Sequence, residues 1–148
     1  MSNYPVWWET TITIYNRYED AQTNIIRWFK HTVEGAFWKN VGNKVTVGEV
    51  TIDSSNTICR IREDSKFKEP YEWVKLPNDE KPNFFTLGRG DIIIKGMVDD
   101  EIDEYTKGQR SSNLLSKYKA LQGCMQIENV GINTGQGRNN PHYYVSGT

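Results

Sequence analysis

Residues 84–96 read FFTLGRGDIIIKG and contain the clearest strand signal of the chain. Gly88, Gly90 and Asp91 come before three consecutive isoleucines, and Gly96 closes the segment. A run of β-branched residues between glycines is typical of a strand in the interior of a sheet. The segment therefore predicts a turn that leads into a buried strand, and a β fold around it.

Strand signals dominate the first two thirds of the chain. Residues 10–15 alternate apolar and polar side chains, and residues 24–33 are rich in β-branched and aromatic types, with a break expected at residues 34–35. In residues 45–52 the apolar positions change parity at Gly48, as they do at a bulge or a tight bend. Together these patterns predict a curved sheet or a small barrel.

Turn signals divide the strands from one another. The sequence DSSN at residues 53–56 predicts a turn, so that residues 57–62 form a hairpin with the strand before them. Two further strands are predicted near the end of the chain, at residues 124–130 and 142–145. Residues 132–141 are expected to form the hairpin loop between those two strands.

One short helix is predicted near residues 111–122. Ser111 or Ser112 is expected to cap it and Gly123 to stop it. Its apolar face is expected to hold Leu114, Leu115, Tyr118 and Leu121.

The 148 residues predict a single domain that is mainly β, a small β-barrel or β-sandwich with long loops. Residues 63–83 carry three prolines and several lysines, which predicts a long loop of the kind that often binds partners. Residues 1–9 are expected to form an N-terminal arm.

Composition limits the function classes. The formal net charge of −1 argues against a strongly basic nucleic-acid binder. No apolar stretch reaches the roughly 20 residues of a membrane helix, and the N-terminus lacks a signal pattern, so a protein made in the cytoplasm without membrane contact is expected. Cys59 and Cys124 lack metal-ligand spacing, which favours buried free thiols over a disulfide or a zinc site.

Motifs that suggest chemistry have simpler explanations. The acidic residues 99–104 lack the EF-hand spacing and are better explained as a solvated loop before the helix. His31 and His142 are the candidate residues of an alternative small hydrolase. Neither has a nucleophile or a paired carboxylate at a sequence spacing that would indicate catalysis. We therefore expect a protein that is not an enzyme, with no catalytic, cofactor-binding or metal-binding residues.

The tryptophans fall into two groups. Trp28, Trp38 and Trp73 are expected mainly in the core, although they are also the residues of an alternative carbohydrate- or peptide-binding groove. Trp7 and Trp8 lie near an end of the chain, where large apolar groups need a partner. They are therefore candidates for an interface with a neighbouring subunit.

The order of several features resembles small neck or minor capsid proteins of tailed bacteriophages. These features are ITIYNRY at residues 12–18, the proline-containing loop, FTL before GDIIIKG at residues 90–96, DEI at residues 100–102, and HYYV at residues 142–145. The match covers most of the chain. Compared with the compact members of that group, this chain has longer loops and an extra helix.

The resemblance implies a structural virion protein of the neck. Proteins of this kind are small β domains like the one expected here. They form rings on portal and adaptor proteins, close the filled head and join the tail-tube or tail-terminator proteins. If the ring surrounds DNA, a balanced charge lets the duplex pass without sequence-specific binding. Trp7, Trp8, Lys66, Lys68 and Lys75 are then the interface candidates, and a tail terminator or other tail-completion protein is the alternative role.

Overall fold

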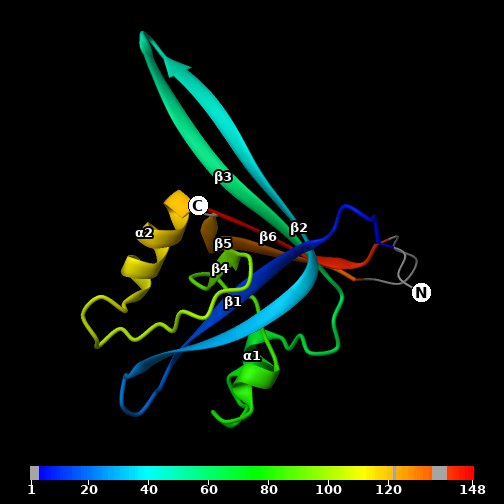
Figure 1. Ribbon diagram of the computed structural model, residues 1–148, viewed down its shortest axis with the longest axis vertical. Coiled ribbons are helices and arrows are strands. Elements are labelled where there is room, and N and C mark those ends of the chain that lie inside the picture. The colour runs from blue at the N-terminus through cyan, green and yellow to red at the C-terminus, as the bar shows by residue number, and fades with distance from the viewer. Residues whose placement is uncertain (1–3, 122, 135–139) are drawn as a thin grey trace.

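The computed structural model describes residues 4–121, 123–134 and 140–148, and these residues form a β-barrel (Figure 1). Its strands are antiparallel and close in the order β1–β2–β3–β6–β5–β4. The strands are β1 (Thr10–Glu19), β2 (Ile26–Val47), β3 (Val50–Arg62), β4 (Ile92–Lys95), β5 (Cys124–Asn133) and β6 (His142–Gly147). The mainly β fold is confirmed, and it is a barrel rather than a sandwich.

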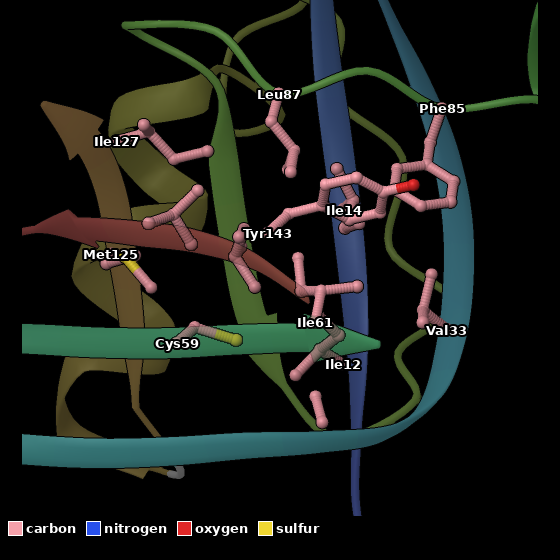
Figure 2. Packing of buried hydrophobic residues seen from close by; sticks show 13 residues of the cluster. Ile12, Ile14, Val33, Cys59, Ile61, Phe85, Leu87, Met125, Ile127 and Tyr143 are labelled. Carbon is pink, nitrogen blue, oxygen red and sulfur yellow. The ribbon is translucent and has the colours of Figure 1, made fainter. Parts of the chain in front are cut away.

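The interior of the barrel is the main hydrophobic core (Figure 2). Ile12 and Ile14 from β1 and Ile93 from β4 are fully buried there, as the alternation and the isoleucine run predict. Figure 2 shows their neighbours from β2, β3, β5, β6 and the segment before β4, which include Val33, Cys59, Ile61, Phe85, Leu87, Met125, Ile127 and Tyr143.

A second cluster lies between the barrel and helix α2 (Ser111–Leu121). Leu114 and Tyr118 of the helix pack against Tyr15 and Ile92 on the barrel. The predicted helix is confirmed, but Leu121 is 67% exposed and does not share the buried face. The Ser111 backbone N–H donates to Glu104 Oε1 at 2.6 Å, so a carboxylate from the preceding loop satisfies this N-terminal donor.

The expected break at residues 34–35 is a β-bulge inside β2. Thr10 pairs with Ala36 and Ile12 with Val33, so the register shifts there. Gly35 has a φ of +76°, and a Cβ atom at this position would lie 2.8 Å from the Arg62 guanidinium group. Glycine therefore lets β2 bend and continue without ending.

The predicted turn at residues 53–56 is wrong. These residues lie within β3, opposite residues 41–44 of β2, and the chain reverses instead at Gly48 and Glu49. Gly48 has a φ of +65°, a conformation that the tight turns of β-hairpins require and that glycine adopts readily. Cross-strand pairing holds the polar segment extended despite its turn-forming composition.

The connections largely follow the prediction. Residues 63–83 form the long link from β3 toward β4 and contain α1 (Pro70–Trp73) and the 3-10 helix η1 (Lys81–Asn83). Part of the expected hairpin loop at 132–141 belongs to β5, and residues 135–139 of that loop lie outside the described residues.

Candidate assembly interface

The ends of β2 and β3 project from the barrel as a two-stranded ribbon (Figure 1). We name residues 41–56 the hairpin arm. The pairing of β1 with β2 reaches only Ala36, and the pairing of β6 with β3 starts only at Thr57. In the described chain the two strands of the arm therefore pair only with each other, and each has an open outer edge.

The register near the tip of the arm pairs apolar positions with apolar ones and polar positions with polar ones. Val45 is opposite Ile52 and Val47 is opposite Val50. The alternate positions pair Lys44 with Asp53 and Thr46 with Thr51. Paired positions therefore alternate in sequence between β-branched apolar residues and polar residues.

The arm is about 23 Å long, because seven paired positions rise about 3.3 Å each. An isolated two-stranded hairpin is at best marginally stable in water, and open strand edges tend to pair with other chains. The open edges of the arm are therefore sites at which a strand of another chain can pair.

The two N-terminal tryptophans have different surroundings. Trp7 is 63% exposed, as expected of an interface candidate. Trp8 is only 5% exposed, because its ring packs against Tyr4, Phe37 and His142 of its own chain. The expectation that Trp8 contacts a neighbour is corrected, since its apolar surface is already covered.

Residues 4–9 are attached to the barrel instead of forming a free arm. The Tyr4 hydroxyl donates to the Pro141 carbonyl, and the Arg62 guanidinium donates to the Trp8 carbonyl at 2.8 Å. The Arg62 guanidinium also lies over the Tyr4 ring, 5.0 Å from its centroid. This part of the predicted N-terminal arm is therefore wrong, and residues 1–3 lie outside the described residues.

The lysines predicted to contact partners lie on the long connection. Lys66 and Lys75 are exposed, whereas Lys68 is half-buried with its ammonium group 5.1 Å from the centre of the Phe84 ring. Lys66 and Lys75 are thus available to a partner, while Lys68 has an aromatic contact within its own chain.

Lys81, which sequence reasoning missed, attaches the long connection to the barrel. Its side chain is buried, and its ammonium group lies 4.4 Å from the centroid of Tyr18 and 5.5 Å from that of Trp73. It donates to the carbonyl oxygens of Val74 and Leu76. Burial lowers the pKa of Lys81. This cage is structural, because the acceptors and rings around the ammonium group all belong to the same chain.

Asp91 stabilises the turn before β4. Its carboxylate accepts hydrogen bonds from the Arg17 N–H at 2.9 Å, the Gly88 N–H at 3.0 Å and the Asn16 side-chain amide at 2.9 Å. Burial raises the pKa of Asp91 to about 6, against the lowering effect of these donors. The segment at residues 84–96 thus contains a buried carboxylate, which joins β1 to the turn before β4.

The histidines and cysteines make structural contacts. His31 Nδ1 lies 2.8 Å from the Pro82 carbonyl oxygen, and His142 Nδ1 lies 2.7 Å from that of Asn140, so in each ring this nitrogen is the donor. Cys59 and Cys124 are buried free thiols, as predicted.

Residues 4–121, 123–134 and 140–148 contain no group of three or more His, Cys, Asp or Glu side chains arranged to hold a metal ion. Within the same part of the chain, no helix combines the length and the apolar character needed to cross a membrane.

The fold and this surface define a small closed antiparallel barrel with a projecting hairpin. A family of unknown function, DUF6751, matches residues 7–148, and the chain belongs to this family. No curated protein and no solved structure matches the chain.

Proposed function

We propose that this chain is a structural, non-enzymatic subunit of the neck of a tailed phage. In this role, copies form a ring that closes the DNA-filled head and connects it to the tail. Its partners are other copies of the chain, the portal and adaptor proteins on one side, and tail-tube or tail-terminator proteins on the other. The sequence resemblance suggests the location, and the hairpin arm supports the assembly role.

The hairpin arm carries the proposal. It projects from a closed barrel, has two open strand edges and pairs valine and isoleucine positions with one another near its tip. A rigid body with an element that reaches outward makes head-to-tail contacts, which give a ring when the rotation between copies closes. Exposed Trp7, Lys66 and Lys75 supply further groups for contacts with neighbouring proteins.

Two alternatives lead to different expectations. A tail terminator is the same kind of subunit but assembles on the tail tube. The test below therefore separates this role from head closure. A carbohydrate- or peptide-binding module needs exposed aromatic rings, but Trp28 and Trp73 are buried, and only the partly buried Trp38 remains of the three expected tryptophans. The structure thus offers this module less support than the sequence did.

The test is negative-stain electron microscopy of the protein mixed with the portal and adaptor proteins encoded beside it. We expect an added layer below the adaptor. A variant in which an Asn-Gly turn replaces residues 43–54 should fold and form no layer, because the strands then end at the Gly42–Ser55 pair. The control variant Tyr71→Ser, which changes an exposed residue of α1, should form the layer.

Failure to bind the adaptor would reject head closure. Assembly on tail tubes alone would instead favour the tail terminator. A layer formed equally well by the arm-shortened variant would show that the arm does not drive assembly.

A further inference from the structure

The second half of β5 has a neighbour on only one side. β4 pairs with β5 at residues 124–126, and Gly90 and Asp91 bond to the backbone of Ile127. Beyond this point, in the described residues, β5 pairs with β6 alone as far as the Asn133–His142 pair. Residues 128–133 therefore present an open strand edge, which neither a proline nor a lysine protects.

The same half of β5 exposes side chains on the core face of the sheet. Val130 is opposite Val145 and Ile132 is opposite Tyr143, and both partners belong to the main core. Opposite residues share a face, yet Val130 is 38% and Ile132 43% exposed. The short β4 leaves this part of the inner face uncovered.

A groove of about 430 Å³ lies beside this edge. Ile132 and Tyr143 line it from the sheet, and Phe67 lines it from the long connection. The rings of Phe67 and Tyr143 stack with their centroids 4.2 Å apart. Four acidic residues, Glu63, Asp64, Glu69 and Glu72, also line the groove. The groove thus lies beside an open strand edge, where a sheet can receive an added strand, and has aromatic, apolar and acidic side chains.

The arm of the same copy projects away from this edge (Figure 1). The arm lies at the N-terminal end of β3, before Thr57. The open edge of β5 ends at Asn133, which pairs with His142. His142 in turn pairs with Arg62, at the C-terminal end of β3. The arm of the same copy therefore does not cover this edge.

We infer that the hairpin arm of a second copy adds as a strand along residues 128–133 of β5. This inference rests on the proposed ring assembly and names its contact. Each strand of the arm has seven paired positions, enough to match the six-residue edge. Residues 45–52 of the arm, VTVGEVTI, carry the β-branched residue types that favour strand pairing. One contact then pairs the β5 edge of one copy with one of the two arm edges of the other.

The contact is tested by photo-cross-linking with p-benzoylphenylalanine in place of Val130. Equal amounts of ¹⁵N-labelled and unlabelled protein are mixed, both at high concentration alone and with portal and adaptor proteins. We expect cross-linked peptides of mixed isotope composition that join position 130 to residues 40–56. The same photo-reactive residue at Met97, which is 70% exposed, should give at least tenfold less of this product.

A second variant tests the edge without the probe. Val130→Lys places a charge on an exposed edge position, so the monomer should fold, while assembly should fall at least tenfold. Met97→Lys is the matched control and should assemble normally.

The outcomes separate this contact from the neck role. Cross-links that reach another segment, cross-links within one copy, or no cross-link under either condition would overturn the arm-to-β5 contact. Microscopy reports the neck role independently, since a layer can form while position 130 links to a different peptide.

Discussion

β2 and β3 belong both to the barrel and to the hairpin arm, and the same strands have opposite surroundings in the two regions. Residues 57–62 of β3 lie between β2 and β6, and Cys59 and Ile61 are fully buried. The arm continues both strands with a single pairing and no covering layer in the described chain. The barrel is thus stabilised within one chain, whereas the arm has no pairing beyond its own two strands in the described chain.

The largest effect is expected from the barrel, at Asp91. Asp91→Ala removes the acceptor of three hydrogen bonds, two of them from backbone N–H groups, and leaves buried donors unpaired. Each such donor costs about 1–3 kcal/mol, so we expect the free energy of unfolding to fall by about 4 kcal/mol. Urea denaturation followed by tryptophan fluorescence measures it.

The exposed Asp99 provides the control. Asp99→Ala should change the free energy of unfolding by less than about 0.5 kcal/mol. A loss of less than about 1 kcal/mol for Asp91→Ala would show that this carboxylate does not organise the turn.

The free energy of unfolding should also depend on pH through Asp91. Its pKa is about 6 in the folded protein and 3.8 as a reference, so the folded state holds the proton more tightly between these values. Protonation of Asp91 therefore adds up to about 3 kcal/mol of stability, which is fully present below about pH 4 and is lost as the pH rises through 6. The difference in unfolding free energy between the wild type and Asp91→Asn should follow this course, and a difference independent of pH would contradict it.

Lys81 should have an intermediate effect. Lys81→Ala removes the ammonium group from the rings of Tyr18 and Trp73 and from its carbonyl acceptors, which should cost about 2–3 kcal/mol. Lys75→Ala, on the same connection but exposed, should cost less than about 0.5 kcal/mol. Equal thermal denaturation of the two variants would mean that the cage does not stabilise the fold.

The sequence predicted the barrel better than the arm, for physical reasons. The isoleucine run before Gly96 predicts burial, which the barrel confirms, whereas alternation at residues 10–15 predicts a half-buried strand, and Thr13 and Tyr15 on its polar side are buried as well. Residues 53–56 have turn-forming side chains, and only their pairing with β2 keeps them extended. The two-residue turn at residues 48–49, between two valine-rich runs, was the available signal for the arm.

Trp8 is the interface candidate that the structure removes, because contacts distant in sequence decide its exposure. Trp8 has the same position and type as Trp7, but only Trp8 packs against Phe37 and His142. The Lys81 cage likewise joins β1, β2 and the long connection, which no local pattern reveals.

The smallest effect on the monomer is expected from the arm. Replacing residues 43–54 by Asn-Gly removes no pairing within the barrel, because β3 meets β6 only from Thr57 onward. The free energy of unfolding should change by less than about 1 kcal/mol, measured by urea denaturation of dilute protein. A larger loss would mean that the arm packs on its own barrel. If the arm instead stabilises through a second copy, the wild type alone should become more stable as its concentration rises, because association favours the folded state by mass action.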